Sequence, residues 1–263
     1  MTQIPILLYH QITDHRDADD PFRLSVSPEK FKQQMHHLAD KGYRCVSLKD
    51  ALAQKAAKTD QHKTFAVTFD DGYLDNYAVA YPILKELGFV ATIFTITDFI
   101  GRSLSWPGAR QVSFMNWSQM REMAADGFDF GAHTQTHPNL PDITAQDALR
   151  EIEFSKRILE DGLKQPVTHF AYPGGHQTAE IQQFVRNTGF SAGLGVDIGD
   201  TDPFNVWRIQ INGSDSMALF RLKTCGYFEQ LKRFRKSSNL AHTVTQMAGS
   251  LLNGRSTTIS ENT

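Results

Sequence analysis

Short apolar segments alternate with amphipathic segments along most of this 263-residue chain. The apolar segments are expected strands, and they cover residues 4–9, 43–48, 64–69, 90–96, 128–132, 167–172, 191–196 and 206–211. An alternation of strands with helices predicts a parallel sheet. Seven or eight such units in about 260 residues favour a (β/α) barrel over an open doubly wound sheet. No Gly-x-Gly-x-x-Gly follows the first strand, which removes the main argument for a dinucleotide-binding fold. We therefore expect an α/β protein built as one distorted, seven-stranded barrel.

Helix start and stop signals lie between the expected strands. Ser27-Pro28-Glu29 begins one helix, in which Phe31, Met35 and Leu38 recur at helical spacing. The other expected helices cover residues 74–87, 117–125, 144–163 and 178–187. The pattern weakens beyond residue 237, so we divide the chain into a domain of residues 1–237 and a C-terminal extension of residues 238–263. We expect this extension to be partly helical, over residues 241–252, or disordered.

Composition narrows the expected partners and location. The chain is 40% hydrophobic and 21% charged, with a net charge of −2. This balance gives no basic surface for nucleic acid or for an anionic membrane, and no window approaches the roughly 20 apolar residues of a transmembrane helix. Cys45 and Cys225 lie outside any short metal-binding spacing, so we expect two free thiols. The first residues lack the basic and apolar regions of a signal peptide. The expected location is the cytoplasm, or outside it if a leader precedes this chain.

Residues that can carry out chemistry follow four of the expected strands. They are Tyr9–His10, Asp70-Asp71-Gly72, His133 with His137, and Tyr172-Pro173-Gly174. In a parallel barrel, catalytic groups lie at the carboxyl ends of the strands. Two histidines four residues apart lie on one side of the chain if the segment turns helically. Together with one carboxylate they form a three-ligand set that leaves a position open, as in catalytic zinc sites. A second, adjacent carboxylate can then remain free as a base.

Each of these groups also has a structural alternative. An isolated Asp-Asp-Gly more often caps the turn into a helix, although Asp75 is the better cap candidate here. A lone histidine pair is more often a surface pair, and a histidine at a strand end, such as His10, is often structural. His169 and His176 are the alternatives to His10 as an acid. Three aromatic residues, Tyr73, Trp117 and Trp207, could stack on sugar rings, but Trp117 and Trp207 are expected to pack inward.

Three of the motifs together resemble those of a known enzyme family. TFDDGY, HTQTH and AYPGG are similar to motifs of the polysaccharide deacetylases, the NodB-type domain of carbohydrate esterase family four. The resemblance covers roughly residues 4–213. The segments LLYH, FKQQMHHLADKGYRCVSL, ATIF and NWSQM resemble one branch of the family, which includes the poly-N-acetylglucosamine deacetylases of biofilm exopolysaccharides.

The resemblance implies a role for each motif residue. Asp70 would be the general base, and Asp71, His133 and His137 would bind one divalent metal ion, commonly Zn²⁺. Tyr172, Pro173 and Gly174 would shape the substrate groove, and the Gly174 backbone N–H would help to hold the oxyanion.

Two positions depart from the usual family pattern. Most members protonate the leaving amine with a histidine near the C-terminus, but here only His242 follows residue 176. In the branch that this chain resembles, the N-terminal Tyr-His histidine takes that role, which here is His10. The third motif usually carries a base-orienting arginine where this chain has Ala171, and we expect Arg208 to replace that arginine in space.

The resemblance implies a metal-dependent hydrolase that acts on a carbohydrate. Water activated by the metal would attack the acetamide carbonyl of an N-acetylated sugar, in a polysaccharide or a glycan precursor. The alternatives are an O-acetyl esterase that uses the same site and a catalytically dead carbohydrate-binding domain. The sequence leaves the oligomeric state open.

Overall fold

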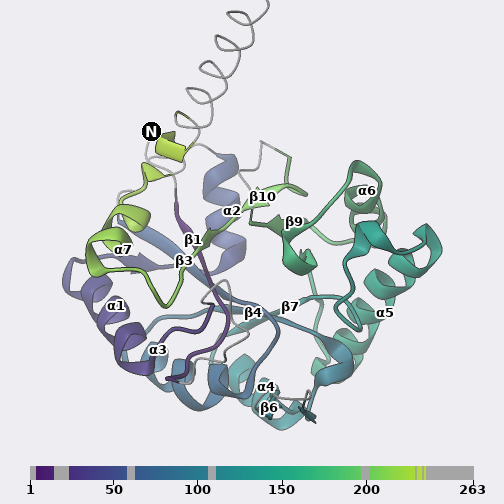
Figure 1. The fold of residues 1–263 in the computed structure, drawn as a ribbon, viewed down its shortest axis with the longest axis horizontal. Helices are drawn as coiled ribbons and strands as arrows, with labels where there is room; N and C mark the ends of the chain where they lie inside the picture. Colours follow the sequence, from purple (N-terminus) through teal and green to yellow (C-terminus); the bar gives the residue numbers. More distant parts are fainter. Residues whose placement is uncertain are drawn as a thin grey trace, which may run out of the picture.

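The computed structural model describes residues 4–14, 24–57, 63–105, 111–196, 202–228, 230–232 and 234. Its centre is one sheet in the strand order β10-β9-β8-β7-β4-β3-β1-β11 (Figure 1). The strands are β1 (Ile6–Tyr9), β3 (Thr64–Phe69), β4 (Thr92–Thr95), β7 (Asp129–Ala132), β8 (His169–Ala171), β9 (Ala192–Gly195), β10 (Val206–Trp207) and β11 (Ile209–Gln210). All neighbours in this order are parallel.

The sheet nearly closes into a barrel through its last strand. Only Arg208 separates β10 from β11, so the two are halves of one interrupted strand. The first half pairs with β9, through Val206 and Leu194, and the second half pairs with β1, through Ile209 and Leu7. Since β10 and β11 count as one strand, the sheet order contains seven strands. This confirms the expected distorted, seven-stranded (β/α) barrel.

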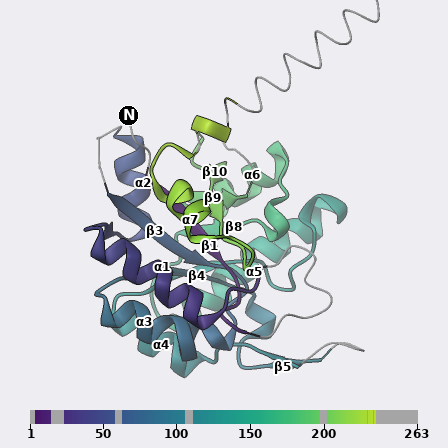
Figure 2. The same ribbon diagram turned by 60° about the vertical axis from the view of Figure 1, so that its left-hand side comes forward.

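Helices surround the barrel, as Figures 1 and 2 show. They are α1 (Pro28–Asp40), α2 (Leu48–Ala56), α3 (Tyr81–Glu86), α4 (Trp117–Ala125), α5 (Ala145–Leu163), α6 (Ala179–Asn187) and α7 (Met217–Thr224), with short turns η1 (Asn76–Ala80), η2 (Thr97–Phe99), η3 (Leu140–Asp142) and η4 (Pro173–Gly175). Ser27, Thr144 and Thr178 cap α1, α5 and α6 through their side chains, which confirms the helix start predicted at Ser27. None of the helices in these described ranges is both long and apolar enough to cross a membrane.

Three local expectations differ from the structure in detail. The strand expected over residues 43–48 is shorter in the structure, where β2 (Arg44–Cys45) pairs with β3. It ends early because Ser47 caps the helix α2, which begins at Leu48. The helix expected over residues 74–87 divides into the wide turn η1 and α3, since Pro82 cannot donate a helical hydrogen bond. Asp75 makes no cap there; it accepts a hydrogen bond from the backbone N–H of Ile12 at 3.0 Å.

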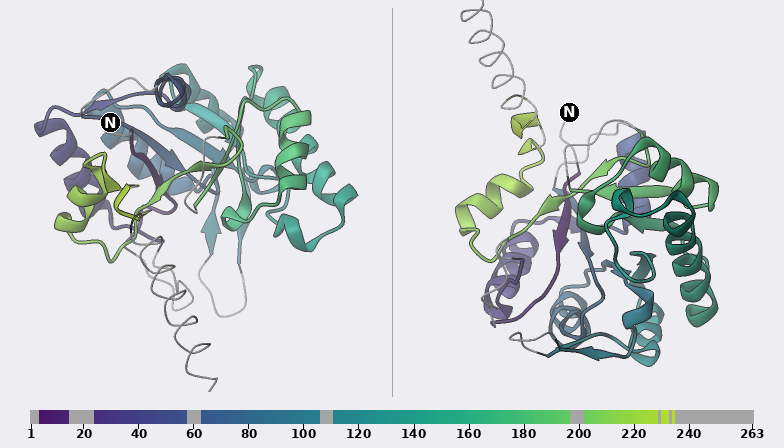
Figure 3. Two further views of the ribbon diagram at one scale, coloured as in Figure 1. Left: turned by 90° about the horizontal axis from the view of Figure 1, so that it is seen from above. Right: turned by 45° about the vertical axis from the view of Figure 1, so that its right-hand side comes forward.

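Two elements were not expected from the sequence, in addition to α2 and α7. Strands β5 (Ser103–Leu104) and β6 (Val112–Ser113) form an antiparallel hairpin that projects from the barrel (Figure 3, left). Both cysteines are free, as expected. The thiol of Cys45 donates to the Val90 carbonyl, and burial raises its pKa to about 12, which makes it a structural residue. The helix expected over residues 241–252 lies outside the described residues.

Alternation along the strands sorts side chains between the helices and the barrel interior. On β3, Phe65, Val67 and Phe69 join the large cluster that includes α1, whereas Ala66 joins the smaller interior cluster. Thr68 continues the interior row, and the next residue of that row is Asp70. The strand pattern therefore aims Asp70 into the carboxyl-end mouth of the barrel.

Candidate active site

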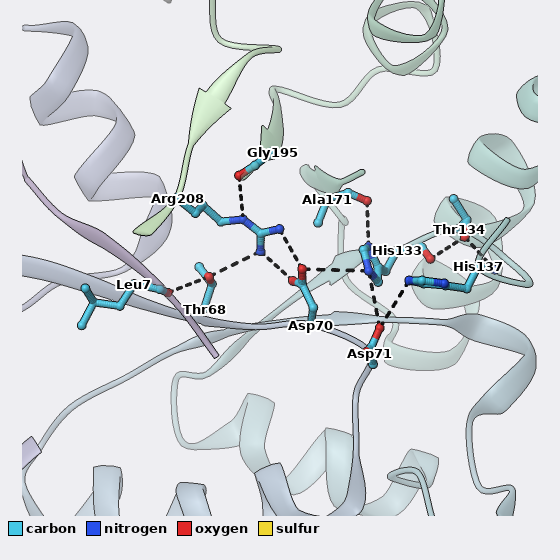
Figure 4. A network of polar contacts seen from close by, with 10 residues as sticks. All are labelled: Leu7, Thr68, Asp70, Asp71, His133, Thr134, His137, Ala171, Gly195 and Arg208. Atoms are coloured by element: carbon cyan, nitrogen blue, oxygen red, sulfur yellow. Dashed lines mark hydrogen bonds and ion pairs between the residues drawn. The ribbon is translucent and has the colours of Figure 1, made fainter. Parts of the chain in front are cut away.

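A sharp turn after β3 separates two adjacent carboxylates. Asp71 has a φ of 73° and Gly72 a φ of 78°, both in the left-handed region. A Cβ added to Gly72 would lie 2.9 Å from Cγ2 of Thr95, so the turn also needs glycine for space. Asp70 stays buried at the mouth of the barrel, while Asp71 faces His133 and His137 (Figure 4).

Asp71, His133 and His137 form a cluster that could hold a metal ion. Their ligand atoms all lie within 4.8 Å of one another. Nε2 of each histidine is 3.5 Å from Oδ1 of Asp71. Ligands about 2.0–2.1 Å from a tetrahedral zinc ion lie about 3.3–3.5 Å apart, so the observed spacing suits such an ion. These are the three residues that the sequence predicted as ligands, and the structure brings them close enough together that they could hold a metal ion.

His133 is prepared to act as a neutral ligand. Its Nδ1 lies 2.8 Å from the Ala171 carbonyl oxygen, which can only accept, so Nδ1 carries the proton and Nε2 keeps its lone pair. Burial lowers the pKa of His133 to about 4, despite the opposing effect of the Asp70 carboxylate. At neutral pH the imidazole is therefore uncharged, with its free lone pair on the side of Asp71.

The HTQTH segment is a loop rather than a helical turn, so the expected helical geometry was wrong. Thr134 and His137 both have a φ of 65°, in the left-handed region. The backbone N–H of His137 donates to Oγ1 of Thr134 at 3.0 Å. The carboxylate of Glu151, on α5, accepts from the backbone N–H groups of Gln135 and Thr136 at 2.8 Å each. Glu151 was not among the residues predicted from the sequence, because it is one of several acidic residues on an amphipathic helix.

Arg208 forms a bidentate ion pair with Asp70. Its Nη1 and Nη2 donate to the two carboxylate oxygens at 2.6 and 2.7 Å, and both side chains are buried (Figure 4). The guanidinium also lies 5.2 Å from the ring centroid of Phe94 in the barrel interior. Burial alone would raise the pKa of Asp70, but Arg208 and His133 outweigh it and lower this pKa to about 2. Asp70 is therefore ionised at neutral pH, and the structure brings Arg208 to the place the sequence predicted.

His10 lies at the same mouth of the barrel. Its backbone carbonyl accepts from Nδ2 of Asn76 at 2.8 Å, which fixes the chain just after β1. The side chain is close enough to Asp70 to contribute to the lowering of its pKa. Within the described part of the chain, Nδ1 of His10 is buried and makes no hydrogen bond. The structure therefore brings the His10 side chain to the same end of the barrel as Asp70, within range of its charge.

The two alternative histidines are less well placed. His169 begins β8, at the opposite end of the barrel, and its Nδ1 lies 3.4 Å from the Asp129 carboxylate. His176 is exposed, and its Nδ1 lies 3.0 Å from Oδ1 of Asn139. We therefore retain His10 as the candidate acid.

The loop after β8 meets the expectations in part. Tyr172 is completely buried and its hydroxyl donates to the Phe204 carbonyl at 2.9 Å, so the expected substrate contact is wrong for this side chain. Pro173 is also buried. Gly174 is exposed with a φ of 61°, and it lies three residues after the carboxyl end of β8. Of the three, Gly174 alone remains able to present its backbone to a substrate.

The aromatic candidates are mostly packing residues. Trp207 is buried, stacks on Phe228 and donates from Nε1 to the Val196 carbonyl. Trp117 packs so closely on α5 that a Cβ on Gly162 would lie 2.1 Å from its ring. Both tryptophans therefore pack inward, as expected. Tyr73 stacks on Phe114, with ring centroids 5.2 Å apart, beside the turn at Gly72.

The chain is similar in sequence to known polysaccharide deacetylases. A sequence profile described as Polysaccharide deacetylase matches residues 57–193. The Bacillus subtilis protein YxkH, which bears the same family name, is 31% identical over 235 residues, covering 88% of this chain and 77% of that protein. The poly-β-1,6-N-acetyl-D-glucosamine N-deacetylase of Staphylococcus aureus is 25% identical over 182 residues, covering 66% of this chain and 61% of that enzyme.

The fold is also shared with a solved structure of a deacetylase. The Streptococcus pyogenes deacetylase PplD, in complex with acetate, superposes with a TM-score of 0.73 at 29% identity, covering 85% of this chain and 98% of that chain. The barrel, the residues at its strand ends and these similarities together show that the chain is a hydrolase of the polysaccharide deacetylase family.

Proposed function

We propose that this chain removes N-acetyl groups from an amino-sugar polysaccharide or glycan precursor. In this proposal it uses one divalent metal ion, which we take to be Zn²⁺. The observation that carries the proposal is the three-ligand cluster of Asp71, His133 and His137 beside the ionised Asp70. The similarity to the staphylococcal N-deacetylase supports the amide substrate, and acetate in the PplD structure is the product expected of deacetylation.

The ligands and the base have separate tasks in this proposal. Asp71, His133 and His137 would hold the metal through one oxygen and two imidazole nitrogens. A bound divalent ion supplies Lewis-acid chemistry, lowering the pKa of water and polarising a carbonyl oxygen. Asp70 would take the proton of the attacking water. Its two oxygens still have free lone pairs, because a carboxylate offers about four acceptor sites and Arg208 uses two.

The remaining steps use His10 and the loop after β8. As the water oxygen bonds to the acetyl carbon, negative charge develops on the carbonyl oxygen, and the Gly174 N–H would donate to it. Breaking the C–N bond then requires a proton on the departing amine, which the His10 imidazole would give. The products are acetate and the free amino sugar.

Metal removal is the direct test of the proposal. We expect purified protein to release acetate from N-acetylglucosamine oligomers, to lose this activity with a chelator and to regain it with one equivalent of zinc. The control is the same assay on an acetylated xylan, an O-acetyl ester. Release from the ester alone would contradict the proposed amide substrate, and activity unchanged by complete metal removal would contradict the proposed metal.

Replacement of His10 tests the proposed acid. His10→Gln should lower kcat by about 10²–10⁴-fold, the usual contribution of a general acid, while zinc still binds one to one. The matched control is His176→Gln, which should retain nearly full activity. A larger loss in His176→Gln than in His10→Gln would reverse the assignment.

A further inference from the structure

We propose that Glu151 is a positioning residue that holds the metal-binding loop in its ligating shape before any metal binds. The inference rests on the proposed function, since it concerns the affinity of the same site. Glu151 lies on α5, outside the three sequence motifs and outside the candidate ligand set. Its carboxylate nevertheless makes three hydrogen bonds to the two residues before His137.

The three hydrogen bonds cover one short stretch of backbone. Oε2 accepts from the N–H groups of Gln135 and Thr136, each at 2.8 Å, and Oε1 accepts from the Thr136 hydroxyl at 2.7 Å. Hydrogen bonds to a carboxylate are roughly twice as strong as those between neutral groups. Glu151 therefore fixes both the direction of this backbone and the side chain that precedes His137.

The loop needs such support because its shape is unfavourable by itself. Thr134 and His137 flank the two bonded residues, and both have a φ of 65°. Residues other than glycine rarely adopt this conformation, and they keep it only where the surroundings enforce it. Thr134 is a β-branched residue, for which the conformation is especially unfavourable. Without external bonds the loop would relax, and His137 would leave its position 3.5 Å from Asp71.

The opposite side of the loop has its own attachment, which makes the role of Glu151 specific. The N–H groups of Thr97 and Asp98, in η2, donate to the carbonyls of Thr134 and Gln135 at 3.2 and 3.0 Å. These bonds hold the half of the loop next to His133. The His133 side chain is itself buried and hydrogen-bonded to the Ala171 carbonyl. His137 is the exposed ligand, with 37% of its side chain accessible. His137 is itself bonded within the loop, through its N–H to Oγ1 of Thr134. Glu151 comes from outside the loop and bonds to Thr136, the residue next to this exposed ligand.

The test compares zinc affinity in Glu151→Ala with that in wild type, by competition with a chromophoric chelator. Loss of a group that orients a metal ligand typically weakens metal affinity by about 10–100-fold, and we expect a loss in this range. The matched control is Glu153→Ala, which removes an exposed carboxylate from the same helix and should leave affinity unchanged. Glu151→Gln keeps an oxygen that can accept from the two N–H groups but lacks the charge. Its loss of zinc affinity should therefore be smaller than that of Glu151→Ala.

Two further measurements separate positioning from a general loss of structure. Amide hydrogen exchange of metal-free protein should speed up at Gln135 and Thr136 in Glu151→Ala, but not at residues of β7. With saturating zinc, kcat should recover to within a few fold of wild type, with KM nearly unchanged. Equal zinc affinity in Glu151→Ala and wild type would overturn the inference.

The outcomes also distinguish this inference from the proposed function. If wild-type protein binds no zinc, the proposed function fails, and exchange at Gln135 and Thr136 still decides whether Glu151 orders the loop. Wild-type exchange rates at those amides in Glu151→Ala would then overturn the inference as well. If wild type binds zinc and releases acetate while Glu151→Ala does both equally well, only the role of Glu151 is refuted.

Discussion

Asp70→Asn should lower turnover by about 10³- to 10⁴-fold while the protein still binds one metal ion. The substitution keeps the size of the side chain but removes the group proposed to take the proton from water. The metal ligands remain, because Asp71, His133 and His137 form the cluster without Asp70. The measurement is acetate release under saturating substrate, together with the zinc content of the purified variant.

The control for this experiment is the neighbouring carboxylate. Asp71→Asn should lose metal affinity as well as activity, since Asp71 lies 3.5 Å from Nε2 of both histidines. Asp70→Asn also leaves the buried charge of Arg208 without its partner, so its folding must be checked by thermal unfolding, and the assay run well below the midpoint. Turnover of Asp70→Asn within tenfold of wild type would rule out Asp70 as the base.

The fold was predictable because its signals are local. Each expected strand was found, including the short β2, since apolar segments between polar helices identify strands of a parallel sheet. The strand-end rule then located the carboxylates and both histidines at one face. The errors arose where a local signal competed with another. Ser47 started a helix inside an apolar segment, and Pro82 forced a wide turn in a helical pattern.

The site was predictable only as far as its residues lie in motifs. The sequence does not distinguish Glu151 from the other acidic residues of α5. The pattern of an amphipathic helix does not show which carboxylate on its polar face will contact a loop elsewhere in the fold. Tyr172 belongs to a motif, yet its side chain faces Phe204 and not the mouth of the barrel, a distinction that depends on strand parity at the end of β8. Arg208 lies 138 residues from Asp70 in the sequence. It became a candidate only because Ala171 stands where the family usually has an arginine.

The interior of the barrel explains how Arg208 reaches Asp70. Ala171 belongs to the interior cluster with Phe94, and its side chain is a single methyl group. Arg208 enters from the break between β10 and β11, lies against Phe94 and reaches the Asp70 carboxylate. Since β10 and β11 pair with different strands, the residue between them is placed where the barrel closes. The break in the strand and the position of the arginine are therefore one feature.

Arg208→Met should lower the free energy of unfolding by about 3–5 kcal/mol at neutral pH, because it leaves the buried Asp70 carboxylate without its partner. In wild type the pair lowers the pKa of Asp70 to about 2. The pair therefore stabilises the fold above the unfolded carboxyl pKa of about 4, and this stabilisation is lost as the pH falls toward 2. The variant loses the largest contribution that opposes burial, so we expect the pKa of Asp70 to rise above its wild-type value.

Two consequences follow for Arg208→Met, and both are measurable. Its loss of stability, from urea unfolding, should shrink as the pH falls from 7 toward 4, since the buried carboxylate then takes up a proton. The acidic limb of its pH–rate profile should move to higher pH, because the proposed base protonates earlier. The double variant Asp70→Asn/Arg208→Met removes both buried charges and should be more stable than Arg208→Met alone. A pH–rate profile like that of wild type, in a variant that still folds, would show that Arg208 does not set the ionisation of Asp70 and that the ion pair has a structural role only.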